Sequence, residues 1–353
     1  MSSDRRMLVL RAVVEDYIQT REPVGSSAVS RDFPLHVSSA TIRNDMAALE
    51  EEGYLVQPHT SAGRVPTEKG YRFFVDRLVK VSPLSKAQRR GIELFFTKST
   101  SLEGTLRQSA RLLAQITGQV AVVASPSIVK SHLRRFEMVP LAWNSFLIVI
   151  ISNTGRVEQR TVVSPSPPSQ AEVDRLITAI NARCDSRQIS LLAQSLRDLG
   201  EQDDFAGLRG FIDQVATAVG DMRDEERTDS LYMSGASKLT RDRESALTTL
   251  APLLDALEEQ VVIMRLMSTL AQNDTESGVG VAIGSETHTQ GLLNASVVTK
   301  GYGTVDEAVS HKAASPLAFV GSIGPTHMNY PTTIAAVKAV AEYLSDFINR
   351  QES

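Results

Sequence analysis

The residues with the clearest chemical potential lie between positions 38 and 44, where short polar side chains precede a helical pattern. They are Ser38, Ser39, Thr41, Arg43 and Asn44. Arginine can bind guanine, and asparagine can bind adenine, each through a pair of hydrogen bonds. Serine and threonine hydroxyls, with the free N–H groups of a helix start, suit phosphate oxygens. The set is typical of a recognition helix whose N-terminal end enters a major groove, although the same residues would also cap an ordinary helix.

A second polar group follows in the loop PHTSAGR, at positions 58–64. We expect Gly63 to permit a tight turn there and Arg64 to lie at its tip, with His59 and Thr60 alongside. An arginine in that position can enter a narrow minor groove or pair with a phosphate. The loop is therefore a candidate second DNA contact, and a solvated surface arginine is the plainer alternative.

Hydrophobic periodicity indicates the elements that would position both groups. In the segment that begins at position 38, Ile42, Met46 and Leu49 fall on one helical face, and Gly53 is suited to end that helix. The expected order is a helix at 4–20, a short helix at 26–32, a helix at 38–52, strands at 54–56 and 65, and a helix after 67. This order predicts a winged helix-turn-helix over residues 1–80.

The rest of the chain predicts two groups of strands separated by a long, mostly helical stretch. The expected strands are at 119–125, 132–141, 143–153, 155–164, 278–286, 292–300 and 317–324, and a final helix follows Pro331. No strand–helix–strand alternation runs through them, which disfavours a doubly wound parallel sheet. One antiparallel sheet with a helical insertion is the simplest interpretation, and two unrelated sheets remain the alternative. The fold class is therefore α+β with several domains.

Composition limits the other possibilities. The chain has 353 residues, a formal net charge of −4 and a single cysteine, Cys184. That length fits two or three domains, and one cysteine forms no internal disulfide or cysteine cluster. The six histidines lack metal-ligand spacing, so we expect no metal and no cofactor. The N-terminus lacks the apolar run of a signal peptide, which predicts a cytoplasmic protein without a membrane partner.

Two longer motifs give the head of the chain a specific resemblance. The stretches VSSATIRNDMAALEEEGYL and PHTSAGRVPTEKGYRFFVD resemble the HrcA family of heat-inducible repressors. The first of them also resembles sugar-responsive winged-helix repressors of the DeoR type. The likeness to HrcA continues in SLYMSGASKL, VAIGSE and GSIGPTHMNY. The triplet 327–329 and Lys238 depart from the family pattern, and both lie outside the segment expected to read DNA.

The resemblance implies a dimer that binds an inverted repeat, called CIRCE, upstream of chaperone operons. It also implies a GAF-like body with an inserted dimerisation domain, and help from the chaperonin GroEL in reaching the active form. The corresponding domains are 1–80 (DNA-binding), 81–168 (first GAF-like part), 169–275 (helical dimerisation insert) and 276–353 (second GAF-like part). An apolar stripe at helical spacing in the insert fits either a dimer seam or ordinary core: Leu250, Leu254, Leu257, Val261 and Met264.

Three functions follow from these patterns, and the first is a non-enzymatic repressor of chaperone genes that heat inactivates. The second is a metabolite-responsive repressor with a ligand in the body, where strands 119–125 and 143–153 would line a pocket or simply form core. The third is an enzyme that uses the glycine-rich segment GVGVAIG at 278–284. That segment lacks the strand–turn–helix context of a dinucleotide site, and no catalytic set accompanies it, so we expect no enzyme activity.

Overall fold

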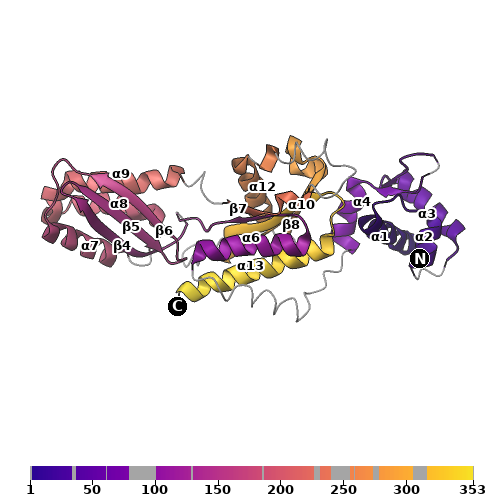
Figure 1. Ribbon diagram of the computed structural model, residues 1–353, viewed down its shortest axis with the longest axis horizontal. Helices are drawn as coiled ribbons and strands as arrows, with labels where there is room; N and C mark the ends of the chain where they lie inside the picture. Colours follow the sequence, from indigo (N-terminus) through magenta and orange to yellow (C-terminus); the bar gives the residue numbers. More distant parts are fainter. Residues whose placement is uncertain are drawn as a thin grey trace.

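The molecule is elongated and has three parts in a row (Figure 1). The computed structural model describes residues 2–33, 37–60, 62–78, 101–128, 130–184, 187–225, 231–239, 255–257, 259–272, 278–304 and 316–352. We call residues 2–78 the head, residues 133–225 the inserted unit, and the remaining described residues the body. The body lies between the other two parts. None of the helices in the described ranges combines the length and apolar character needed to cross a membrane.

The head contains the helices and strands expected from the sequence. Its elements are α1 (Ser2–Thr20), α2 (Ser26–Asp32), α3 (Ser39–Glu51), β1 (Leu55–Val56), β2 (Val65–Pro66), α4 (Glu68–Phe73) and a π-helical turn, η1 (Phe74–Leu78). The two short strands pair antiparallel. Leu10, Val13 and Val14 of α1 are buried against Ile42 and Leu49 of α3, so the predicted apolar faces meet in one core.

The body is built on a five-stranded antiparallel sheet with the order β7-β3-β10-β9-β8. Its strands are β3 (Val120–Ala124), β7 (Leu231–Ser234), β8 (Gly280–Ile283), β9 (Ala295–Thr304) and β10 (Pro316–Pro325), and its helices are α6 (Leu102–Thr117), α10 (Ala236–Leu239), α12 (Gln260–Gln272) and α13 (Tyr330–Glu352). Two 3₁₀ turns, η4 (Gly284–Thr287) and η5 (Gln290–Leu292), follow β8. Residues 317–324 of β10 are buried without alternation. Helices therefore cover both faces of this sheet, with α6 and α13 on one side and α12 on the other.

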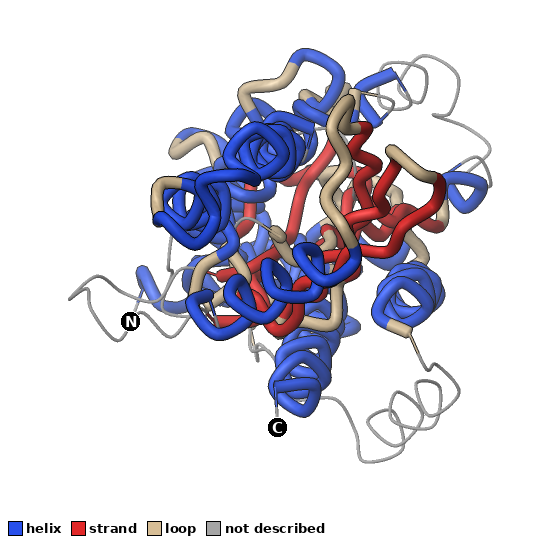
Figure 2. Tube along the Cα trace, turned by 90° about the vertical axis from the view of Figure 1, so that its left-hand side faces the viewer, coloured by secondary structure: helices blue, strands red, loops and turns tan. Residues whose placement is uncertain are grey.

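The inserted unit has its own three-stranded sheet and its own core. Strands β4 (Leu133–Ala142), β5 (Ser145–Ser152) and β6 (Val157–Val163) form an antiparallel sheet in that order, followed by α7 (Gln170–Cys184), η2 (Ile189–Leu191), α8 (Leu192–Gly200), η3 (Asp203–Leu208) and α9 (Arg209–Glu225). Figure 2 views the molecule along its long axis from this end. Burial alternates strictly along β5, so the helices cover only one face of the sheet.

The structure corrects the expected single sheet and the boundary at 168/169. Among the described strands, β4, β5 and β6 pair only with one another, and they pack on α7, α8 and α9. The expected boundary therefore cuts through a unit that folds together. Local patterns could not reveal this, because alternation predicts a strand without naming its partner. The mostly helical stretch also contains β7, which pairs with β3 at the edge of the body sheet.

Candidate nucleic-acid interface

Helix α3 begins and ends where its sequence predicts. Ser38 is the N-cap, and its hydroxyl accepts a hydrogen bond from the N–H of Thr41 at 3.2 Å. At the other end Gly53 adopts φ +77°, and the N–H groups of Gly53 and Tyr54 donate to the carbonyls of Glu50 and Leu49. This pair of hydrogen bonds is the Schellman motif. Glycine is common at its left-handed position because it lacks a Cβ. The ends of the helix are therefore fixed locally.

The outward face of α3 carries the side chains expected to read bases. Arg43 and Asn44 are exposed, as are Ser38 and Ser39, while Thr41 is partly exposed and its hydroxyl lies 2.9 Å from that of Ser38. Within the described part of the chain, neither the Arg43 nor the Asn44 side chain has a hydrogen-bond or ion-pair partner. Both are free to bind a groove that approaches this end of the helix.

Two ion pairs hold the opposite face of α3 against α1. Asp45 is buried and accepts two hydrogen bonds from the Arg5 guanidinium, at 2.7 and 3.0 Å. Glu52, just after the last residue of α3, pairs with Arg6 of α1. Sequence reasoning missed both pairs. Asp45 falls in the apolar stripe with Ile42 and Leu49, and this position could have indicated the first pair. A buried carboxylate requires a charged or hydrogen-bonding partner.

The loop between β1 and β2 is organised by one glutamine. The amide of Gln57 donates to the carbonyls of Thr60 and Ala62 at 3.0 and 2.9 Å, and its backbone N–H donates to Glu50. His59 and Thr60 are exposed at this loop, as the sequence predicts. They remain available as a second contact beside α3.

The expected position of Arg64 at the tip of the loop is wrong. Its backbone pairs with Val24 in an isolated β-bridge, and its side chain makes a 2.8 Å ion pair with Glu50 of α3. Only 19% of that side chain is exposed. Arg64 therefore ties the base of the hairpin to the helix and does not extend toward a ligand.

Gly63 is also needed for a different reason from the one expected. A Cβ at this position would overlap the carbonyl oxygens of Pro23 and Val24, so the glycine permits the hairpin to lie against the α1–α2 loop. We expect Gly63→Ala to lower the free energy of unfolding of the head by about 1–3 kcal/mol, as forced overpacking does. Urea unfolding measures this. Gly210→Ala is the control, because nothing lies within 4 Å of a Cβ there. Equal effects of the two changes would contradict the close contact.

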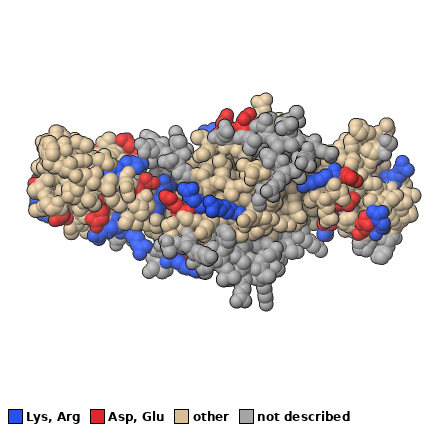
Figure 3. Space-filling model, in the orientation of Figure 1, with Lys and Arg blue, Asp and Glu red and all other residues tan. Residues whose placement is uncertain are grey.

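Charge is mixed on the face of the head that is visible in Figure 3. Figure 3 shows Lys and Arg beside Asp and Glu on the described part of this face. The sequence explains this, since residues 1–80 hold equal numbers of basic and acidic side chains. Any DNA binding by this part must therefore depend on the placement of particular groups more than on net charge.

The apolar stripe at 250–264 does not form one exposed seam. Leu250 and Leu254 lie outside the described residues. Leu257 is buried in the shared core of head and body, Met264 packs against that core, and Val261 is 56% exposed. Ile263 and Met267 are the fully buried residues of α12. Of the described stripe residues, Leu257 and Met264 therefore contribute to core packing and Val261 does not.

Two cavities in the described part of the body bear on the question of a ligand site. One measures about 310 Å³ and lies between α6 and β7, beside Arg107 and Tyr232. The other measures about 240 Å³ and lies where Ala124 of β3 and Phe319 of β10 meet Met264 of α12. Arg156 at its edge is engaged by Glu158 and by the carbonyl of Pro126. The two volumes lie at or just below the lower end of the roughly 300–1,000 Å³ of ligand pockets. Strand β5, expected to line such a site, lies in the other unit. The two cavities therefore give the metabolite-responsive alternative little support.

The glycine-rich segment at 278–284 has a packing role. A Cβ at Gly280 would overlap the carbonyl of Leu270, so this glycine lets α12 lie close to β8. Among the described residues no group of three or more His, Cys, Asp or Glu is arranged to hold a metal ion. Cys184 is buried in the core of the inserted unit.

Comparison with known proteins places this geometry in context. Residues 103–334 match the family model described as the HrcA protein C-terminal domain. The chain is 55% identical over 99% of its length, and 98% of the relative's, to a protein of Bifidobacterium longum (strain DJO10A) named heat-inducible transcription repressor HrcA. Proteins of the same name from Beutenbergia cavernae and Streptomyces avermitilis are 47% and 43% identical, each covering at least 98% of both chains.

A solved structure shares the fold. A crystal structure of a hypothetical protein at 2.2 Å resolution matches 99% of both chains with a TM-score of 0.64 and 23% sequence identity. That likeness extends through all three parts of the molecule.

Proposed function

The chain belongs to the HrcA family of heat-inducible transcription repressors, and on that premise we propose that it represses heat-shock chaperone genes by binding DNA. The relatives are named as regulators of transcription, which are not enzymes. The single structural observation that supports the proposal is the exposed N-terminal end of α3, with Arg43 and Asn44 free of described partners.

In this proposal the head is a winged helix-turn-helix and α3 is its recognition helix. Arg43 and Asn44 contact base edges in the major groove, while Ser38, Ser39 and the first N–H groups of α3 contact phosphates. His59 and Thr60 supply the second contact from the hairpin. Arg64 and Glu50 keep that hairpin at a fixed distance from the helix, because their ion pair joins the two.

We further propose that the body is GAF-like and that the inserted unit forms a dimer. The uncovered face of its sheet presents six apolar side chains from three neighbouring strands, which we call the open sheet face: Val139, Leu147, Val149, Ile151, Val157 and Val163. Exposed apolar patches of this kind mark protein interfaces.

A second copy of the chain fits the open sheet face better than an unrelated partner does. Arg135 and Glu137 lie side by side at its edge, so two copies related by a twofold axis can place each against the other's opposite charge. An inverted-repeat operator of the CIRCE type requires the same twofold symmetry. Two sheets packed face to face would remove the apolar side chains of both copies from water.

Heat would act through the stability of this assembly. A folded domain is stabilised by only about 5–15 kcal/mol, and that margin shrinks as temperature rises toward the midpoint of unfolding. We propose that the chaperonin GroEL returns the repressor to its folded dimer. When other unfolded proteins occupy the chaperonin, fewer operators are bound and chaperone genes are expressed.

The proposal is tested by DNA binding before and after heating. We expect the protein to protect an inverted repeat upstream of the chaperonin operon in a footprint, and a scrambled repeat to remain unprotected. A brief heat treatment should remove the footprint, and added chaperonin with ATP should restore it. No protection at any temperature would refute the repressor, and restoration that is independent of chaperonin would refute the switch.

A further inference from the structure

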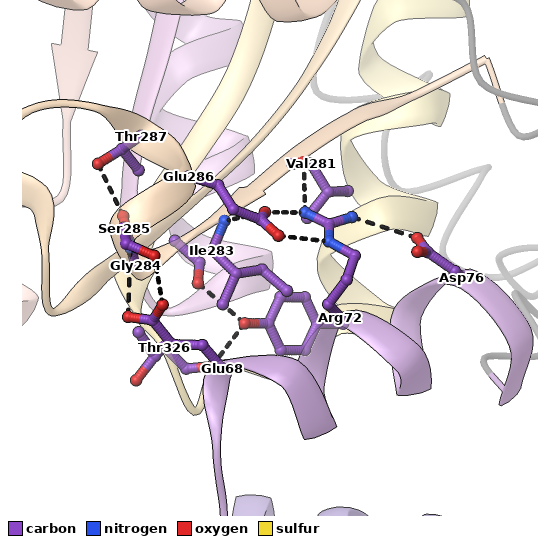
Figure 4. Close-up of polar contacts among 12 residues, drawn as sticks. Glu68, Arg72, Asp76, Val281, Ile283, Gly284, Ser285, Glu286, Thr287 and Thr326 are labelled. Atoms are coloured by element: carbon purple, nitrogen blue, oxygen red, sulfur yellow. Dashed lines mark hydrogen bonds and ion pairs between the residues drawn. The ribbon is translucent and has the colours of Figure 1, made fainter. Parts of the chain in front are cut away.

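Head and body are joined by a polar junction that the DNA-binding proposal does not use. Helix α4 of the head lies against the end of β8 and the turn η4 of the body (Figure 4). Arg72 donates to both carboxylate oxygens of Glu286, and to the carbonyl of Val281 at 2.8 Å. One turn earlier, Glu68 accepts hydrogen bonds from the N–H and the hydroxyl of Ser285, at 3.2 and 2.5 Å. Five hydrogen-bonding residues therefore join two segments about two hundred positions apart.

The junction also has a tightly packed apolar side. Tyr330, at the start of α13, is fully buried and its ring lies 5.9 Å from that of Tyr71 in α4. Gly284 adopts φ +54°, and a Cβ there would overlap the Glu68 carboxylate. Farther along the same surface, Arg21 donates to the carbonyl of His327 at 2.8 Å. Because these contacts lie at separate points, they resist rotation of the head relative to the body, which a single ion pair would not do.

The Arg72 side chain keeps its positive charge at the junction. Burial lowers the pKa of Arg72, but the hydrogen bond to Glu286 and the charges of Glu286 and Asp76 outweigh burial and shift the pKa upward. Only 28% of the Arg72 side chain is exposed, compared with 75% for Arg31 in its ion pair with Asp32. A two-point arginine–carboxylate pair is also more directional than a pair that lysine would make.

We propose that Arg72 and Glu68 are positioning residues that fix the direction of α3 relative to the body. This inference rests on the proposed dimer. The open sheet face lies at one end of the molecule and α3 at the other (Figure 1), so a small rotation at the junction moves α3 by a large amount. A fixed junction therefore sets the distance between the two recognition helices of a dimer. The result is selectivity for the spacing between the two halves of the operator.

The experiment measures affinity for a series of DNA duplexes with different half-site spacings and for a single half-site. We expect the wild-type protein to prefer one spacing, and Arg72→Ala to reduce that preference by about tenfold or more. Half-site affinity should not change, because the Arg72 side chain binds residues of the body and not the proposed reading end of α3. The spacing preference of Arg72→Lys should lie between those of the wild type and Arg72→Ala. Arg77→Ala, which removes an exposed arginine from η1 of the same head, should behave as wild type.

A second readout separates positioning from a loss of folding. Hydrogen exchange at the Ser285 amide, which donates to Glu68, should become faster in Arg72→Ala while the core of α3 stays protected. An unchanged spacing preference in Arg72→Ala would overturn the inference and leave the repressor proposal intact. A wild-type protein that binds a half-site and an inverted repeat equally well would instead overturn the proposed dimer and the inference with it.

Discussion

Arg43→Ala is expected to weaken operator binding by about 1–3 kcal/mol, or roughly 5- to 140-fold, and to relax discrimination at one base pair in each half-site. The physical reason is that the Arg43 guanidinium is exposed at the end of α3, without a described partner, and can donate two parallel hydrogen bonds to a guanine. Its loss removes contacts that only one base pair satisfies. A phosphate contact would be lost equally on all sequences.

The measurement is competition between the operator and the same duplex with each base pair replaced in turn. Arg175→Ala is the matched control, because it removes the same charge from an exposed position on α7 at the opposite end of the molecule. The control should keep both affinity and base preference. If Arg43→Ala lowered binding equally on all sequences, Arg43 would contact the DNA backbone and α3 would not be the reading element.

Leu147→Asp is expected to dissociate the proposed dimer and to remove most of the affinity for an inverted repeat. Leu147 lies on β5, the central strand of the three, and its neighbour on β4 is Val139. An unpaired carboxylate buried between two sheets should cost about 3 kcal/mol or more, which is at least roughly a hundredfold in the dimer dissociation constant. In the monomer the same aspartate faces water, so folding should change little.

Sedimentation or light scattering over a range of concentrations measures the dissociation constant directly. Ala171→Asp is the control, because it adds the same charge at an exposed position in the first turn of α7. A variant that remains dimeric would show that the copies meet elsewhere. A monomeric variant should still bind a single half-site, which distinguishes loss of the dimer from loss of the head.

Most of the head followed from local sequence patterns. Ser38, Gly53 and Thr67 cap or end helices through bonds to residues a few positions away, so their sequence context suffices to predict α3 and α4. The periodic apolar residues of α1 and α3 gave the buried faces for the same reason. The exposed face of α3, with Arg43 and Asn44, lies opposite that buried face.

Long-range partners were beyond the reach of the same reasoning. Arg64 looked like a free arginine because Glu50, which binds it, lies fourteen positions away across a hairpin. The sequence patterns assigned no role to Glu68 and Arg72, whose partners lie in β8 and η4. The partner of a charged side chain can be identified only once the fold shows which distant segments lie together.

The amino-acid sequence by itself determined which segments of the head are helices or strands, where those helices begin and end, and which side chains α3 exposes. These features depend on backbone conformation, capping and hydrophobic periodicity, all of which act over one or two turns. Only the tertiary structure decided that β4, β5 and β6 form a separate sheet, that Ile263 and Met267 are the residues α12 buries, and that α4 joins head to body. Those outcomes depend on which surfaces of the folded chain meet. The hydrophobic periodicity of a segment predicts its own conformation, but it does not identify the distant segment that pairs with it.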